Sequence, residues 1–365
     1  MANNQSVENL GKSASSLAQP SCCTTGKTIV YAAFKGMGDL LNAAPVISEQ
    51  LRCGHSVKLL LFPGMMLEEF VSLLDFGPEV ANLELISLPV SGGIRSLGRF
   101  LRIASKIPAD LVWISPHGPR EASSWKIPLL LWLTKIALWR NGKIAAADSE
   151  HLSWLFDIRV PIDRDLPLYE REWRAFMMME ADGKLDVPLP RVKFLPKIDS
   201  EKTKPRMYDV LIHPGANASN RTWPYEHYSA LVQSLPPELT IAVLGLPQDL
   251  QRMRSVLPDN RGIIFLSGSL EEAIIAIARA RVVLAMDSGT AHFAQNLGIS
   301  TVALFGKSAP DTIIGRNSSV LPIYERRFSC QPCGRATCSQ PEVYCMNSIS
   351  AETVVAAVKS LLSKS

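Results

Sequence analysis

One stretch near the end of the chain, residues 282–306, limits most strongly what this sequence can fold into. It reads VVLAMDSGTAHFAQNLGISTVALFG. The apolar residues 282–285 suit a buried strand, a polar turn breaks that strand, and a helix over residues 291–297 can end at Gly298. A second apolar run predicts another buried strand. The stretch therefore predicts a strand, tight turn, helix, strand unit.

The polar turn of this unit has a chemistry of its own. Ser288, Gly289 and Thr290 stand where the helix starts, and free N–H groups plus the helix dipole favour an anion there, such as a pyrophosphate. Asp287, at the end of the strand, can accept hydrogen bonds from sugar or ribose hydroxyls. From the turn alone, an ordinary connection with Ser288 as the helix cap is the simpler interpretation.

The wider pattern resembles the signature of glycosyltransferase family nine, the bacterial lipopolysaccharide heptosyltransferases. The positions that match the signature are Asp287, Ser288, Gly289, His292 and Phe305-Gly306. The resemblance implies an α/β fold of the GT-B type, with two Rossmann-like domains facing a central cleft. It also implies an inverting, metal-independent transfer from a nucleotide-diphosphate sugar, with ADP-heptose as the family default. The donor site would include Asp287, Ser288, Gly289, Thr290 and His292.

The start of the chain repeats the strand, turn, helix pattern. Residues 28–34 suit a strand, two glycines allow a tight turn, and a helix follows. A dinucleotide fingerprint would need a third glycine where Leu41 stands, so an NAD oxidoreductase is disfavoured. Gly38, Asp39 and Pro45 resemble the family's N-terminal motif. This implies that Gly38 lines the acceptor site and that Asp39 is the general base, with a helix cap as the alternative role for Asp39.

A second loop, residues 214–224, resembles the family's His-Pro-Gly-Ala segment ending in Trp-Pro. The family usually has a lysine three residues before that proline, and Arg221 keeps the charge with a different donor geometry. The resemblance implies that Arg221 stabilises the leaving diphosphate, and a surface arginine is the alternative. Donor contacts are expected at Gly215, Asn217, Ser219, Gly268 and Ser269.

Two further segments of the first half bear on the acceptor. His117 and Arg120 follow a predicted strand and are candidates for binding an acceptor that carries phosphate. Residues 125–139 are the most apolar segment, but they are too short to span a membrane. A buried helix is one interpretation, and a patch resting on the inner membrane leaflet is the other.

Four cysteines close together predict a metal site. Four thiolates can surround one tetrahedral ion of zinc or iron, and reduced free thiols are the alternative. The spacing C-x2-C-x4-C-x6-C is not that of a standard zinc finger. The candidate ligands are Cys330, Cys333, Cys338 and Cys345.

Amino-acid composition predicts where the tail, the two domains and the linker between them lie. The tail over residues 1–26 is rich in Ser, Asn and Thr, which predicts disorder and no secretory signal. A first domain over 27–195 and a second over 206–345 flank a linker rich in proline and charge. A helix within 346–365 is expected to pack back on the first domain. A net charge of +4 without a basic, aromatic-rich run argues against nucleic acid.

These observations predict a cytoplasmic glycosyltransferase with a nucleotide-sugar donor and a glycolipid or other hydroxyl acceptor. No cofactor is expected for the chemistry. Contact with the inner membrane stays open. A nucleotide-sugar epimerase of the same fold is a rival, because it would turn over donor alone. A non-catalytic sugar-nucleotide-binding protein is another rival, although binding alone needs neither the base Asp39 nor the cation Arg221.

Overall fold

The structure is a computed structural model. The residues that it describes are 26–32, 36–61, 66–87, 98, 102, 106–114, 132, 142–147, 153–161, 166–180, 194–216, 218–315, 318–333, 335 and 337–364.

The first half of the described chain builds one parallel sheet, in the strand order β3-β2-β1-β4-β5-β6. The strands are β1 (Thr28–Ala32), β2 (Ser56–Leu61), β3 (Leu83–Ser87), β4 (Leu111–Ile114), β5 (Lys143–Ala147) and β6 (Ile158–Val160). The described helices of this half are α1 (Met37–Arg52), α2 (Leu67–Val71) and α5 (Leu168–Glu180), and α1 packs against α5. Because the strands are parallel, the loops that follow them meet at one edge of the sheet.

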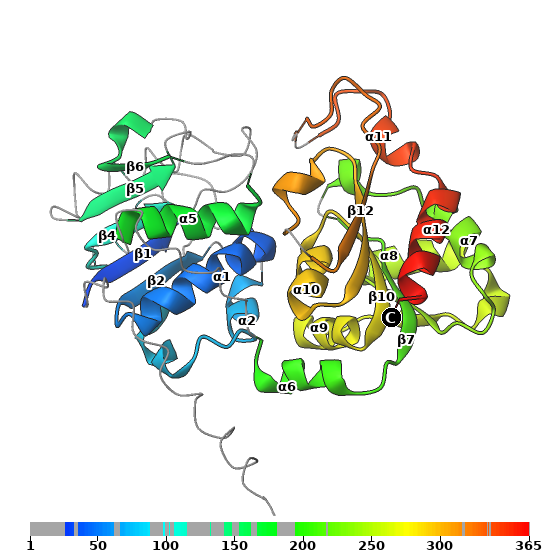
Figure 1. Cartoon of the computed structure of the whole chain (residues 1–365), viewed down its shortest axis with the longest axis horizontal. Coiled ribbons are helices and arrows are strands. Elements are labelled where there is room, and N and C mark those ends of the chain that lie inside the picture. The colour runs from blue at the N-terminus through cyan, green and yellow to red at the C-terminus, as the bar shows by residue number, and fades with distance from the viewer. Residues whose placement is uncertain are drawn as a thin grey trace, which may run out of the picture.

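The second half builds another parallel sheet, in the order β12-β11-β10-β7-β8-β9. The strands are β7 (Tyr208–His213), β8 (Ile241–Leu244), β9 (Ile264–Leu266), β10 (Ala280–Met286), β11 (Ser300–Phe305) and β12 (Val320–Tyr324). The helices are α7 (Tyr225–Ser234), α8 (Pro247–Val256), α9 (Leu270–Ala278), α10 (Gly289–Leu297), α11 (Tyr344–Asn347) and α12 (Ala351–Leu362). Figure 1 shows the two α/β halves side by side, which confirms the predicted fold class.

The central strand β10 shows how the second half buries both faces of its sheet. Side chains alternate along a strand, so one set of residues faces each layer. Val282 and Leu284 belong to the core beneath α7, α8 and α12. Val283 and Ala285 belong to the core beneath α9 and α10. A strand covered on both sides explains why this segment is apolar without interruption.

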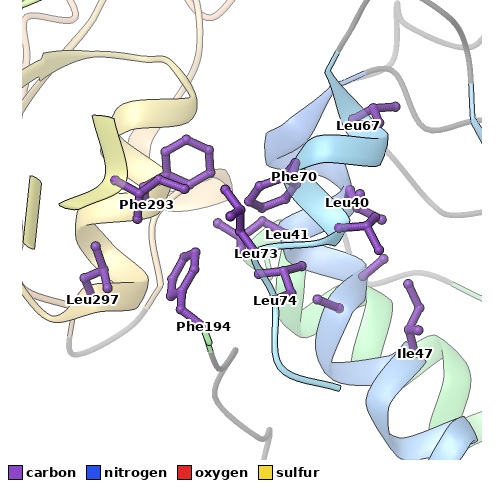
Figure 2. Packing of buried hydrophobic residues seen from close by; sticks show 14 of the residues in the cluster. Leu40, Leu41, Ile47, Leu67, Phe70, Leu73, Leu74, Phe194, Phe293 and Leu297 are labelled. Carbon is purple, nitrogen blue, oxygen red and sulfur yellow. The ribbon is translucent and has the colours of Figure 1, made fainter. Parts of the chain in front are cut away.

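The layer of α9 and α10 also joins the two halves. Phe70 of α2 packs against Phe293 of α10, with ring centroids 5.3 Å apart. Figure 2 shows these rings meeting between the halves, with Leu73, Leu74 and Phe194 beside them. The backbone N–H of Leu270 also donates to Glu69 Oε1 at 3.2 Å. This packing fixes the position of α10 relative to the first half.

The segment predicted as a linker is partly helical: it forms α6 (Pro196–Asp199) and a 3-10 helix, η3 (Ser200–Thr203), because Pro196 suits a first helical position. One expectation about the connections differs from the structure. In the part of the chain that the structure describes, the final helix α12 packs against α7, β10 and β11 of the second half, where packing on the first half was expected. Its apolar face belongs to the second-half core, through Val354 and Val358.

The apolar residues 125–139 lie outside the described residues except for Trp132, and the tail over 1–25 lies outside them as well. Within the part of the chain that is described, no helix has the length and apolarity to cross a membrane.

Candidate functional site

The turn between β10 and α10 leaves the start of that helix uncapped. Ser288 is the N-cap residue, yet its side chain makes no capping hydrogen bond. Its hydroxyl oxygen is buried without a hydrogen-bond partner among the described residues. Gly298 ends the helix with φ of 72°, a left-handed conformation that glycine adopts easily. The first N–H groups of α10 therefore remain available to an anion, together with the positive end of the helix dipole.

Arg221 brings a cation to this turn. It ends the 3-10 helix η4 (Ser219–Arg221), which follows β7. Its Nη1 donates to the backbone oxygen of Asp287 at 3.1 Å, and its Nε lies 3.5 Å from Asp287 Oδ2. The Arg221 side chain is 31% exposed and that of Asp287 is 6% exposed. Asp287 thus contacts the guanidinium, while part of the Arg221 side chain remains exposed to solvent.

The loop after β7 lines a pocket of about 280 Å³. The lining residues are Gly215, Ala216, Ser219, Thr222, Tyr225, Asp249 and Arg252. Tyr225 Oη donates to Asp249 Oδ1 at 3.2 Å, and the Arg252 guanidinium lies 5.8 Å from the Tyr225 ring centroid. A Cβ on Gly215 would come within 3.1 Å of Asp249 Oδ2, so a larger residue here would press against this carboxylate. The pocket combines a carboxylate, a cation and an aromatic ring.

His213, the last residue of β7, lies beside Gly215 of the pocket wall: a Cβ on that glycine would come within 3.3 Å of His213 Cε1. Burial lowers its pKa to about 4, and the nearby Asp249 carboxylate opposes that shift only in part. His213 is therefore neutral at pH 7, and its Nδ1 has no hydrogen-bond partner among the described residues.

The first half reaches this site through the start of α1. Gly36 is the N-cap residue of α1, and Asp39 lies in the first turn. A Cβ built on Gly38 would come within 3.2 Å of His292 Cδ2, so the imidazole of α10 lies directly against the backbone of α1. Burial lowers the pKa of His292. The carboxylates of Asp287 and Asp39 act to raise that pKa, and Arg221 acts to lower it.

His292 therefore marks where the predicted catalytic residues meet. A charge affects the pKa of a neighbour only over a short range, so Asp39, Asp287 and Arg221 all lie near this one imidazole. Asp39 comes from the first half, and the other two come from the second. Asp39, the predicted base, and Arg221, the predicted leaving-group cation, thus both influence the same imidazole.

Other predicted residues lie elsewhere or cannot be placed. Ser269 begins α9 in a capping box, with its Oγ accepting from Glu272 N at 3.2 Å and its own N–H donating to Glu272 Oε2 at 2.8 Å. Its polar groups are thus occupied within its own helix, and Gly268 lies beside them. His117, Arg120 and Asn217 lie outside the described residues.

The four cysteines lie on one segment, residues 330–345, named here the cysteine loop. All four are free thiols. Burial, with the nearby Cys333, Cys338 and Cys330, raises the pKa of the Cys345 thiol. Among the residues that the structure describes, however, no three His, Cys, Asp or Glu side chains are grouped closely enough to hold a metal ion. The four thiols are neighbours, but they do not form a ligand set in this arrangement.

Sequence reasoning missed Asp249, Tyr225 and Arg252. A signal was present, because Asp249 lies in the first turn of the helix that follows β8, at the sheet edge where such folds bind ligands. Lys307 was also missed. It lies two residues after the end of β11 and is 6% exposed, which is unusual for a lysine.

Comparisons with known proteins identify the family of this chain. The sequence pattern of glycosyltransferase family 9 (heptosyltransferase) matches residues 124–344, a range that includes Arg221 and Asp287 but not Asp39. The chain is 26% identical to lipopolysaccharide heptosyltransferase 2 of Salmonella typhimurium over 263 residues, which cover 66% of this chain and 72% of that protein.

Solved structures show the same fold. The structure of E. coli ADP-heptose LPS heptosyltransferase II matches with a TM-score of 0.65 and 19% identity, over 93% of this chain and 99% of that one. The iron-containing dodecameric glycosyltransferase TibC from enterotoxigenic E. coli matches with a TM-score of 0.52 and 12% identity, over 93% and 77%. Because the family pattern covers more than half of the sequence, the chain belongs to glycosyltransferase family 9, the heptosyltransferases, and is an enzyme that transfers a sugar.

Proposed function

We propose that this enzyme transfers heptose from ADP-heptose to a hydroxyl of a lipopolysaccharide-core acceptor, with inversion at the anomeric carbon. The observation that supports the proposal is the close approach of His292 to Gly38, since Asp39 follows Gly38 in the chain and His292 belongs to α10, whose first residue has no side-chain cap. ADP-heptose is the proposed donor because the solved heptosyltransferase II is described as an ADP-heptose enzyme. A lipopolysaccharide acceptor is proposed because the relative in Salmonella typhimurium is a lipopolysaccharide heptosyltransferase.

The donor would lie along the carboxyl edge of the second sheet. Its diphosphate would take the N–H groups of Gly289 and Thr290, with Arg221 beside it. Its nucleoside would extend toward the pocket that Asp249 and Tyr225 line. Asp287 and the neutral His292 would hydrogen-bond the sugar hydroxyls.

The chemistry then needs one base and one stabilised leaving group. The acceptor oxygen attacks the anomeric carbon while the Asp39 carboxylate removes its proton. The bond between that carbon and the diphosphate oxygen breaks, and ADP leaves with the electron pair. Arg221 and the α10 N–H groups stabilise the charge that develops on the departing diphosphate. A group opposite the diphosphate is the right place for the base, because attack comes from the other face of the sugar.

Two further proposals concern contact with the membrane and a metal ion. A glycolipid acceptor would bring this enzyme to the cytoplasmic face of the inner membrane, and the apolar residues 125–139 are the candidate contact. We also propose that the cysteine loop takes up one metal ion; the structural neighbour TibC is described as iron-containing. The thiols would have to move closer together to do so, and no step of the reaction is assigned to the ion.

Incubation with a panel of nucleotide sugars, followed by mass spectrometry, tests the proposed donor. Release of ADP from ADP-heptose only when a heptose-deficient lipopolysaccharide is present supports it, and the anomeric configuration of the product reports inversion. Conversion of a donor without any acceptor would indicate an epimerase instead. Tight donor binding without any conversion would indicate a binding protein.

A further inference from the structure

The cysteine loop is fastened to the diphosphate side of the site by several hydrogen bonds. Gln331 Nε2 donates to the Gly306 oxygen at 2.8 Å, and the N–H of Cys333 donates to the Lys307 oxygen at 3.0 Å. A Cβ on Gly306 would come within 2.9 Å of Cys345 Sγ and 2.6 Å of Met346 Sδ. The loop thus packs tightly on the turn that follows β11.

One backbone oxygen of this loop accepts hydrogen bonds from two buried side chains. Lys307 Nζ donates to the oxygen of Arg335 at 2.8 Å, and Asn220 Nδ2 donates to the same oxygen at 3.0 Å. Lys307 is 6% exposed and Asn220 is 2% exposed. A charged donor strengthens such a bond, and low exposure protects it from competition by water.

Asn220 links this network to the leaving-group cation. Asn220 is the buried residue of η4, a 3-10 helix of three residues, and Arg221 follows it in the chain. The turn itself is short, with one hydrogen bond from the Arg221 N–H to the Ala218 oxygen at 3.0 Å and one from the Thr222 N–H to the Ser219 oxygen at 3.2 Å. So short a turn has little rigidity of its own. Its placement depends on what its buried side chain contacts.

We propose that the cysteine loop is a positioning element for catalysis, and that it holds Arg221 in place through the Arg335 oxygen, Asn220 and Lys307. The inference rests on the proposed role of Arg221. Lys307 and Asn220 touch no reacting atom in this scheme, and they act only by fixing the turn that carries the guanidinium. A displacement of about 1 Å in such a group can lower a rate by about 100-fold. Any change that loosens the cysteine loop should therefore lower turnover.

The test combines Lys307→Met with a matched control, Arg261→Met. Arg261 also donates to backbone oxygens, those of Leu235 at 3.2 Å and Pro236 at 3.0 Å, but it lies before β9, at the other edge of the same sheet. Both variants lose a cation bonded to a backbone oxygen. We expect Lys307→Met to lower kcat at least 10-fold with donor affinity changed less than 3-fold, and Arg261→Met to leave both near the parent values.

A double-mutant cycle separates positioning from simple destabilisation. If Lys307 acts through Arg221, Lys307→Met should lower kcat in the parent but change it less than 2-fold in an Arg221→Ala background. Equal fold-losses in both backgrounds would overturn the proposal, as would near-parental turnover of Lys307→Met.

Hydrogen exchange gives a reading that does not depend on turnover. The amide protons of Arg221 and Thr222 should exchange at least several-fold faster in Lys307→Met than in the parent and in Arg261→Met. Unchanged exchange in η4 would overturn the link between the loop and the turn. If the parent protein shows no transfer from ADP-heptose, the proposed function fails, and the exchange measurement still decides whether the cysteine loop fixes η4.

Discussion

Replacing Arg221 tests how the leaving group is stabilised. The guanidinium lies at the start of α10 and is held by Asp287 at 3.1 Å and 3.5 Å. Two unit charges about 4 Å apart interact by roughly 4 kcal/mol at an effective dielectric constant of about 20. Because the Arg221 side chain is 31% exposed, solvent screens part of this attraction. We therefore expect Arg221→Ala to lower turnover by about 100-fold, near the lower end of what such a contact is worth.

The same change should affect folding and donor binding much less. A partly exposed ion pair contributes at most about 1 kcal/mol to stability, which corresponds to a fall of roughly 2–4 °C in Tm for a domain of this size. The intact donor carries less charge on its diphosphate than the departing ADP does, so donor affinity should change less than turnover. Arg221→Lys keeps the charge and should recover most of the rate, although the forked geometry is lost.

Steady-state kinetics with ADP-heptose and a heptose-deficient acceptor, alongside ADP binding by calorimetry, measure these quantities. Arg261→Ala serves as the control, because it removes a partly buried arginine that lies before the edge strand β9 and bonds to the Leu235 oxygen. Near-parental turnover of Arg221→Ala would refute the reasoning, since another cation would then hold the diphosphate. An equal loss in donor affinity and in kcat/KM would also refute it, because Arg221 would then act in the ground state.

Three further predictions concern pH, packing and metal content. Because the folded pKa of His213 is about 4, the stability that depends on its neutral form is complete above pH 6.5 and is lost as the pH falls toward 4. Denaturant titrations should register a loss of up to about 3 kcal/mol over this range, and His213→Gln should flatten the curve. Gly306→Ala should lower stability by about 1–3 kcal/mol, because its Cβ would meet Met346 Sδ at 2.6 Å; an unchanged Tm would mean that the cysteine loop is loosely packed. Purified protein should carry about one zinc or iron ion per chain, and Cys333→Ser should lower metal content and Tm together; metal-free protein from a chelator-free preparation would exclude the site.

The parts of this fold that could be predicted are those governed by local patterns. The uninterrupted apolar run of β10 and the turn at Asp287 follow from periodicity and from the chemistry of helix starts. The role of Ser288 was less predictable, because a serine at a helix start normally caps it. In the structure its hydroxyl makes no cap, which leaves the helix N–H groups available.

The contacts that join distant segments could not be predicted from local patterns. The approach of His292 to Gly38 depends on how the two halves pack, and the contact of Phe70 with Phe293 is part of that packing. The packing of α12 on its own half depends on where the sheets leave an apolar face that no other helix covers, and α12 covers such a face of the second sheet. The bond from Asn220 to the Arg335 oxygen joins residues 115 positions apart, and no local pattern connects the two.

The most direct test of the mechanism compares the parent enzyme with Asp39→Asn. Asparagine keeps the shape and one side-chain oxygen of Asp39 but cannot take a proton from the acceptor. The variant should melt within a few degrees of the parent and bind ADP-heptose with similar affinity, while its turnover falls by about two to four powers of ten. An Asp39→Asn enzyme that still transfers heptose at close to the parental rate would contradict the mechanism, because the base would then have to be another group.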